Sequence, residues 1–156
     1  MNESRNSLHK EKFNPDEIIE NFVKSGRTLN ILVSEDESIN LKYLELMFQN
    51  IGFNCDCASD GRETLAMMRQ KKYDIVLLDM QMPVMNGDEV LAFLQNDDMK
   101  KDTCIIVQTA FSMPGDEEKY LSLGCNSYLS KPIDWNKLKK IISEAIVNFV
   151  QEKNKS

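Results

Sequence analysis

Five short apolar runs that alternate with helical patterns constrain the fold of this chain more than any other feature. The runs cover residues 29–33, 53–57, 74–78, 104–108 and 127–129. Three of them contain ILV, IVLL and CIIV, in which apolar residues follow one another without interruption. A strand with one solvent-exposed face would alternate apolar and polar residues, so we expect both faces of these strands to be covered. Because each crossover helix returns the chain to the same edge of the sheet, the strands should be parallel. The sequence therefore predicts a doubly wound α/β fold.

Apolar residues at helical spacing fill the segments between these runs. The first three helices carry such residues in turn: Leu41, Leu44, Phe48 and Ile51, then Leu65 and Met68, then Val90, Phe93 and Leu94. A fourth and weaker helix is expected at about residues 115–123. The fifth begins after an expected N-cap at Asp134 and has the longest stripe: Leu138, Ile141, Ile142, Ala145, Ile146 and Phe149.

The two ends of the chain differ from this pattern. Residues 1–27 contain few large apolar side chains, and we expect an N-terminal extension or linker there. The alternative is a docking helix that opens at Pro15 and Asp16 and ends near Gly26. Residues 28–151 are expected to form the folded domain, and residues 152–156 a disordered tail.

Composition excludes several classes of function. The net charge is −6, which argues against a nucleic-acid partner because phosphates demand a basic face. No apolar run approaches the roughly 20 residues that span a bilayer, and the polar start is no secretory signal, so we expect a cytoplasmic protein without a membrane segment. Cys55 and Cys57 have no histidine near them, which favours free thiols over a zinc site.

Polar side chains follow the apolar runs at the points where ligands bind in such folds. They are Ser34, Glu35, Asp36 and Glu37 after the first run, Asp79 after the third, Thr109 after the fourth and Lys131 after the fifth. Each alone has an ordinary explanation, such as a helix cap or a solvated charge. Together, the carboxylates repel one another, and Mg²⁺ is the cation that such oxygen ligands suit. A carboxylate can itself attack phosphorus, and a lysine can hold a phosphoryl oxygen.

These residues lie in four blocks, ILVSEDESIN, DIVLLDMQMPVMNG, VQTA and YLSKPID, which resemble the motifs of response-regulator receiver domains of two-component signalling. The resemblance covers about residues 29 to 150 and is strongest to the receivers of hybrid sensor histidine kinases. It implies a flavodoxin-like (βα)5 fold with a five-stranded parallel sheet in the order 2-1-3-4-5. It also implies a phosphoryl donor, either a histidine kinase or a histidine phosphotransfer protein.

The resemblance also implies a role for each matching residue. Asp79 corresponds to the phosphoryl acceptor, and Lys131 to the phosphate-binding lysine. The family positions that hold Mg²⁺ correspond to Glu35, Asp36, Asp79 and the backbone carbonyl of Gln81. Thr109 is similar to the switch hydroxyl and Tyr128 to the switch aromatic. A cis bond before Pro132 is implied, as is possible homodimerisation through the fourth helix, the fifth strand and the fifth helix.

One alternative is an Mg²⁺-dependent phosphatase of the haloacid dehalogenase type, which also uses an aspartate nucleophile. That class needs a second aspartate two residues later as a proton donor, and this position is Gln81. We therefore expect a phosphoacceptor with at most slow autodephosphorylation, and no enzyme. Whether the chain is a stand-alone receiver or part of a longer hybrid kinase stays open from the sequence.

Overall fold

The computed structural model describes residues 13–154. The chain divides into two compact units, one formed by Leu29–Asp134 and the other by the segments on either side of it. Within residues 13–154, none of the helices is both long enough and apolar enough to cross a membrane.

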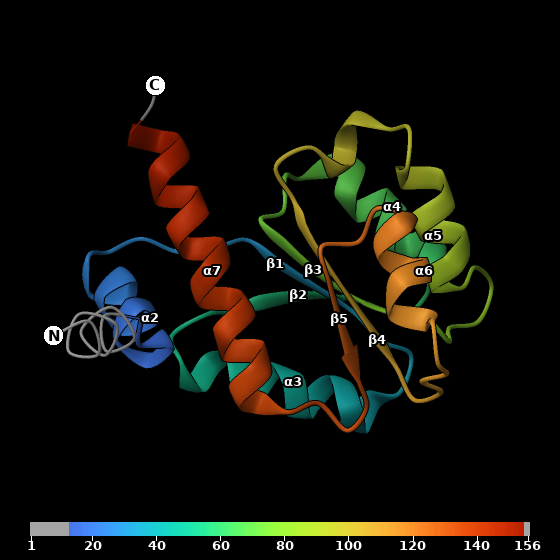
Figure 1. The fold of residues 1–156 in the computed structure, drawn as a ribbon, viewed down its shortest axis with the longest axis horizontal. Helices are drawn as coiled ribbons and strands as arrows, with labels where there is room; N and C mark the ends of the chain where they lie inside the picture. Colours follow the sequence, from blue (N-terminus) through green and yellow to red (C-terminus); the bar gives the residue numbers. More distant parts are fainter. Residues whose placement is uncertain (1–12, 155–156) are drawn as a thin grey trace, which may run out of the picture. The chain divides into compact units, whose positions relative to one another are not determined.

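The unit Leu29–Asp134 is built on a five-stranded sheet (Figure 1). Its strands are β1 (Ile31–Ser34), β2 (Cys55–Ala58), β3 (Ile75–Asp79), β4 (Cys104–Thr109) and β5 (Ser127–Ser130). All neighbouring pairs are parallel and the order is β2-β1-β3-β4-β5. The predicted fold class and strand order are confirmed. Each strand ends one residue later than its predicted end, so that Asp79 and Thr109 are the last residues of their strands.

The helices of this unit are α3 (Ser38–Asn50), α4 (Gly61–Gln70), α5 (Gly87–Leu94) and α6 (Asp116–Ser122), with a short 3-10 helix η1 at Asp98–Lys100. Side-chain caps fix two of the helix starts. Asp60 accepts a hydrogen bond from the Glu63 backbone at α4, and Asn86 accepts one from the Glu89 backbone at α5.

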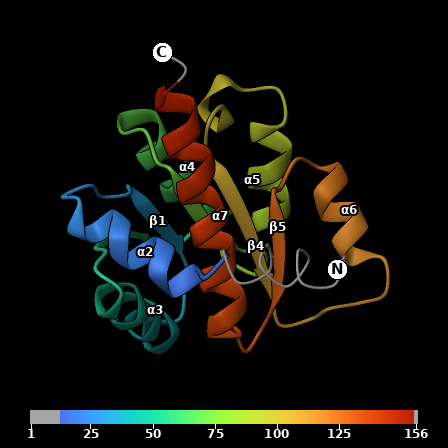
Figure 2. The same cartoon turned by 60° about the vertical axis from the view of Figure 1, so that its left-hand side comes forward.

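Successive strand residues face opposite sides of the sheet, and both sides are buried. Leu32, Val76, Leu78, Ile105 and Val107 share one core cluster with buried residues of α4, α5 and α6. Their neighbours along the strands, such as Val33, Leu77 and Ile106, face the other side, where α3 lies (Figure 2). This two-sided burial is the physical reason for the unbroken apolar runs.

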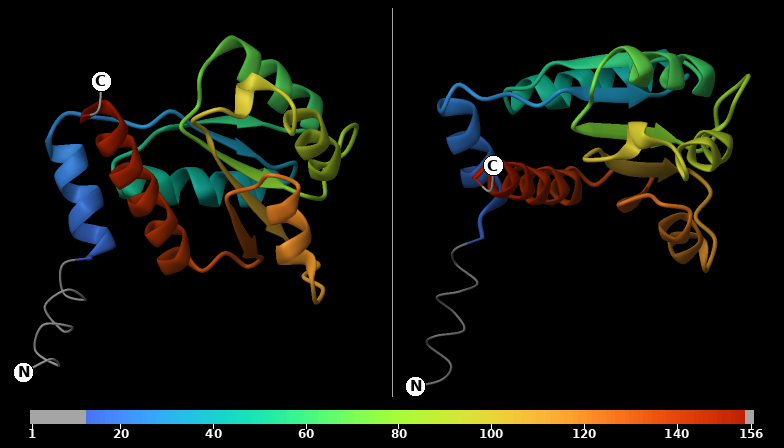
Figure 3. Two further views of the ribbon diagram at one scale, coloured as in Figure 1. Left: turned by 45° about the horizontal axis from the view of Figure 1, so that its top comes forward. Right: turned by 90° about the horizontal axis from the view of Figure 1, so that it is seen from above.

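The second unit contains α2 (Pro15–Lys24) and α7 (Trp135–Asn154), which pack side by side (Figure 3). Asn14 caps α2 by accepting hydrogen bonds from the next turn. The rings of Phe22 and Phe149 meet edge to face at 6.1 Å, and Lys139 Nζ lies 2.7 Å from Asp16 Oδ1. A helix here is one of the two alternatives that the sequence left open, and the domain boundaries stay predictions.

The expected tail at residues 152–156 falls partly outside the described residues. Helix α7 continues to Asn154, three residues into that segment. The last two residues, 155–156, lie outside the described range.

Candidate functional site: a carboxylate cluster bridged by a lysine

Three carboxylates meet at the carboxyl edge of the sheet. One oxygen from each of Glu35, Asp36 and Asp79 lies within 4.8 Å of the others. The register explains the meeting, because Ser34 pairs with Leu78 and the next residues leave neighbouring strands at the same level. Glu35 and Asp79 are each 1% exposed, whereas Asp36 is exposed. Two of the three negative charges are therefore buried.

Lys131 bridges the two buried carboxylates. Its Nζ lies 2.9 Å from Glu35 Oε2 and 2.9 Å from Asp79 Oδ2. The backbone holds the lysine in place, since its N–H donates to the carbonyl of Thr109 at 2.8 Å, beyond the end of β5. The peptide bond to Pro132 is cis. The lysine thus supplies a positive charge between two negative ones.

Burial and charge act in opposite directions in this bridge. Burial raises the pKa of the Glu35 carboxyl, and the hydrogen bond from Lys131 opposes part of that rise. Burial alone would lower the pKa of the Lys131 ammonium, but the hydrogen bonds and charges of Asp79 and Glu35 outweigh it and hold this pKa above its ordinary value. Lys131 therefore keeps its proton.

Glu35 also accepts hydrogen bonds from neutral groups. Gln108 Nε2 donates to Oε2 at 3.2 Å, and the backbone N–H of Glu37 donates to Oε1 at 3.4 Å. Asn40 Nδ2 lies 3.5 Å from Oε1, at the limit of a hydrogen bond. Gln108 is a residue that the sequence reasoning missed, because a glutamine inside an apolar strand carries no pattern that points to a site.

Thr109 and Gln81 form a second group beside Asp79. Gln81 donates twice, from its backbone N–H to Asp79 Oδ1 at 3.0 Å and from Nε2 to Thr109 Oγ1 at 3.2 Å. The backbone N–H of Phe111 also donates to Thr109 Oγ1, at 3.1 Å. The threonine oxygen therefore already accepts two hydrogen bonds, and its own proton is available to a further acceptor. The hydrogen bond from the Gln81 side chain to Thr109 is a contact that the sequence did not predict.

Tyr128 is not part of the carboxylate cluster. It pairs with Val107 across β4 and β5. Its hydroxyl hydrogen-bonds Ser112 Oγ at 2.9 Å, and its ring stacks on Tyr120 with centroids 5.8 Å apart. The side chain of the predicted switch aromatic thus packs against α6 and the loop before it.

Gly87 lets the chain return close to Asp79 after β3. A Cβ at this position would lie 2.6 Å from the Asp79 carbonyl oxygen and would also overlap Met80. Its N–H donates to the Met80 carbonyl at 3.3 Å. Only glycine permits this approach, which closes the loop over the end of β3.

The donors present fit a hard divalent cation. All three clustered groups are carboxylates, and together they carry more negative charge than Lys131 offsets. Oxygen ligands of this kind suit Mg²⁺, which keeps several waters when it binds to a few carboxylates.

Comparison with known proteins identifies the family. The model of the response regulator receiver domain matches residues 31–143, and the chain belongs to this family. Receiver domains are signalling switches of two-component systems and obtain phosphoryl groups from histidine kinases.

Two curated relatives differ in how much of their own length this domain occupies. The chain is 35% identical over 104 residues to the polar-differentiation response regulator DivK of Brucella anthropi, covering 67% of the chain and 85% of DivK. It is 32% identical over 133 residues to hybrid signal transduction histidine kinase I of Dictyostelium discoideum, covering 81% of the chain but 8% of that kinase.

Solved structures agree on the fold. The receiver domain of Francisella response regulator 1452 matches with a TM-score of 0.73 at 23% identity, covering 78% of this chain and 99% of that one. The receiver domain of sensor histidine kinase PA1611 from Pseudomonas aeruginosa PAO1 matches with a TM-score of 0.69 at 28% identity, covering 77% and 98%. That structure holds a magnesium ion in its active-site cleft.

The lysine bridge makes a prediction for stability. Lys131→Met should lower the free energy of unfolding by about 3 kcal/mol, because it leaves Glu35 and Asp79 buried without a cation. Adding Glu35→Gln to this variant should recover about 1 kcal/mol or more, since one of the two repelling charges is removed. Urea unfolding measures both changes, and Lys101→Met, at an exposed position, is the control. A further loss of stability on adding Glu35→Gln would contradict the bridge.

Proposed function

We propose that this protein accepts a phosphoryl group on Asp79 from a phosphohistidine donor and thereby switches a surface that a partner protein binds. The observation that carries the proposal is the position of Asp79. It lies at the end of β3, between a buried lysine bridge on one side and the Gln81–Thr109 group on the other. The donor is a histidine kinase or a histidine phosphotransfer protein, in keeping with the family.

The transfer replaces one bond to phosphorus with another. A carboxylate oxygen of Asp79 forms the new O–P bond as the N–P bond of the phosphohistidine breaks, and the bonding electrons return to the imidazole nitrogen. Lys131 holds Asp79 Oδ2 at 2.9 Å, so its ammonium is next to the oxygens that gain charge. The Thr109 hydroxyl, which accepts hydrogen bonds from Gln81 and Phe111, donates a hydrogen bond to a phosphoryl oxygen.

Glu35, Asp36, Asp79 and the backbone carbonyl of Gln81 are the groups that would hold Mg²⁺. When bound, the ion would offset the charge of the carboxylates and of the incoming phosphoryl group. The most accessible carboxylate, that of Asp36, carries charge that Lys131 does not offset.

Position 81 argues against the phosphatase alternative. A phosphatase of the haloacid dehalogenase type needs an acid there, and the amide of Gln81 is instead engaged with Thr109 at 3.2 Å. An amide has no proton to give to a leaving group at neutral pH. We therefore infer a phosphoacceptor that loses its phosphoryl group slowly, with Gln81 and Phe111 lining the approach to Thr109.

The output is inferred to pass through Thr109 to Tyr128. When the threonine hydroxyl turns toward the phosphoryl group, the space it leaves lets Tyr128 rotate inward, away from Ser112. Homodimerisation through α6, β5 and α7 stays a prediction, as do the cytoplasmic location and the absence of nucleic-acid or membrane partners.

The acceptor is tested by labelling. A small phosphodonor with Mg²⁺ should add one phosphoryl group to the full chain, detectable by intact mass, because Asp79 combines the lysine contact with the neighbouring Gln81–Thr109 group. Asp79→Asn should abolish the adduct, whereas Asp98→Asn, at an exposed aspartate, should keep it. Undiminished labelling of Asp79→Asn would rule out this assignment.

The metal site is tested by melting. At ten times its Kd, Mg²⁺ should stabilise the protein by about 1.4 kcal/mol, which raises Tm by roughly 3–6 °C. Asp36→Ala should remove most of this rise with little change in the metal-free melt, because Asp36 is exposed. Asp98→Ala should respond to Mg²⁺ like the unaltered protein. An equal rise in Asp36→Ala would contradict the proposed ligands.

The switch is tested with beryllofluoride, which mimics the phosphoryl group on a carboxylate. Amide NMR shifts should spread from Asp79 through Thr109 to Tyr128 and α6. In Thr109→Ala they should stop at the metal site, because the hydroxyl that links the two regions is gone. Shifts at Tyr128 of the same size in both proteins would mean that Thr109 does not carry the signal.

A further inference from the structure

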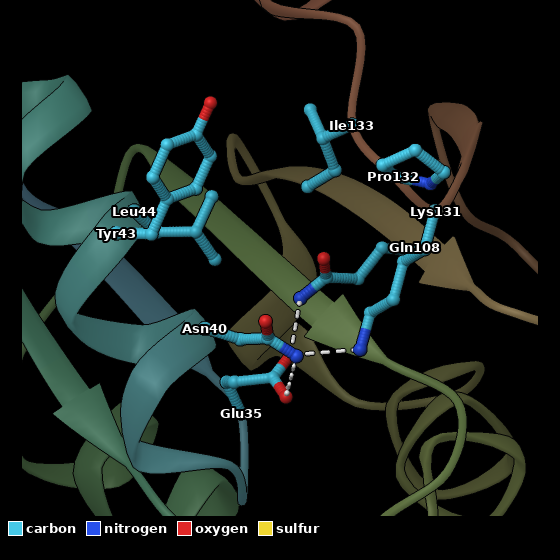
Figure 4. A pocket seen from close by; sticks show the side chains of 8 residues that line it. All are labelled: Glu35, Asn40, Tyr43, Leu44, Gln108, Lys131, Pro132 and Ile133. Carbon is cyan, nitrogen blue, oxygen red and sulfur yellow. Dashed lines mark hydrogen bonds and ion pairs between the residues drawn. The ribbon is translucent and has the colours of Figure 1, made fainter.

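A cavity of about 370 Å³ lies in the unit Leu29–Asp134, beside the lysine bridge (Figure 4). Its walls are apolar for the most part, with Tyr43 and Leu44 from α3 on one side and Pro132 and Ile133, after β5, on the other. Pockets of this size with few polar groups are typical of sites for small organic molecules.

One polar group in this cavity lacks a partner. Gln108 is 0% exposed, and its Oε1 has no hydrogen-bond partner in the part of the chain that the structure describes. The amide cannot turn round to change this, because Nε2 donates to Glu35 Oε2 and a carboxylate accepts but does not donate. Figure 4 shows the Gln108 oxygen directed away from Glu35, toward the space that Leu44 and Ile133 border. A buried carbonyl of this kind is costly unless a donor reaches it.

A glutamine is also unusual at this point of the strand. The preceding residues of β4, Ile105, Ile106 and Val107, are all apolar and buried. An apolar side chain at position 108 would avoid the unpaired carbonyl altogether. The glutamine therefore adds an unpaired hydrogen-bond acceptor to a cavity whose other polar lining residues are Glu35, Asn40 and Lys131.

We propose that this cavity binds a small neutral aromatic molecule whose N–H or O–H group donates to Gln108 Oε1. Tyr43, 58% exposed at the rim, offers a ring against which a flat molecule can pack. An anionic ligand is disfavoured at the inner end because the Glu35 carboxylate is charged there and the Gln108 carbonyl oxygen carries a partial negative charge. A cation is disfavoured by the apolar walls and by the ammonium of Lys131.

The cavity shares Glu35 and Lys131 with the carboxylate cluster. A bound molecule would therefore contact the lysine that the proposed phosphoryl transfer uses. This coupling rests on the proposed function, whereas binding itself does not. The binding test accordingly uses the unphosphorylated full chain without Mg²⁺, so that its result is independent of phosphorylation.

Indole and benzofuran are matched probes, since they have nearly the same shape and only indole carries an N–H. In amide NMR titrations both should shift Tyr43, Leu44 and Ile133 saturably. Indole should bind roughly three- to tenfold more tightly, because only it satisfies the Gln108 carbonyl. Equal affinities, shifts elsewhere, or no saturation by either probe would overturn the proposal. The last result would mean that water alone pairs with Gln108.

Two variants test which residues are responsible for the binding of these probes. Gln108→Leu should bring the affinity for indole down to that for benzofuran and leave benzofuran unchanged. Ile133→Trp, which fills the cavity, should abolish binding of both. A preference for indole that persists in Gln108→Leu would overturn the assignment of the acceptor. The comparison of the two probes on the unaltered protein decides the question even where a variant fails to fold.

Discussion

The bridge of Lys131 between Glu35 and Asp79 is the interaction on which this site depends. The parallel register places two buried carboxylates at the ends of adjacent strands, and carboxylates so close repel each other strongly in a poorly solvated environment. The ammonium at 2.9 Å from both offsets that repulsion. Because Lys131 follows β5, Glu35 follows β1 and Asp79 ends β3, one positive charge links three strands of the sheet.

Neutral hydrogen-bond donors add to the contacts that Lys131 makes with the carboxylates. Gln108 holds Glu35, and Gln81 holds both Asp79 and Thr109. Neutral amides satisfy the oxygens without adding a second positive charge that would compete with a cation at the open side of the cluster. They also keep Glu35 hydrogen-bonded if Lys131 shifts toward a new anionic group on Asp79. The site can thus gain negative charge without leaving a buried carboxylate unpaired.

The sequence predicted the sheet and the charged residues because both follow from a regular pattern. Unbroken apolar runs belong to parallel strands, and the residues that end such strands meet at one edge. The sequence pattern did not predict features that depend on a single contact between side chains. Phe93 has helical spacing with Val90 and Leu94, yet it is 41% exposed with the Arg69 guanidinium over its ring. The hydrogen bonds of the Gln108 and Gln81 side chains depend on which atoms face them in the folded chain, and spacing holds no such information.

The three carboxylates differ in burial, and this difference determines what each one contributes. Glu35 and Asp79 are buried, so their charges act on the fold and must be offset within it. Asp36 is exposed, and water already screens its charge, so it adds little to folding but stays free to meet a solvated cation. If the fold buried all three carboxylates, a second lysine would be needed to offset their charge. The site would then carry less net negative charge to attract a metal ion. The buried charges are therefore offset by Lys131, and the exposed one remains accessible to a solvated cation.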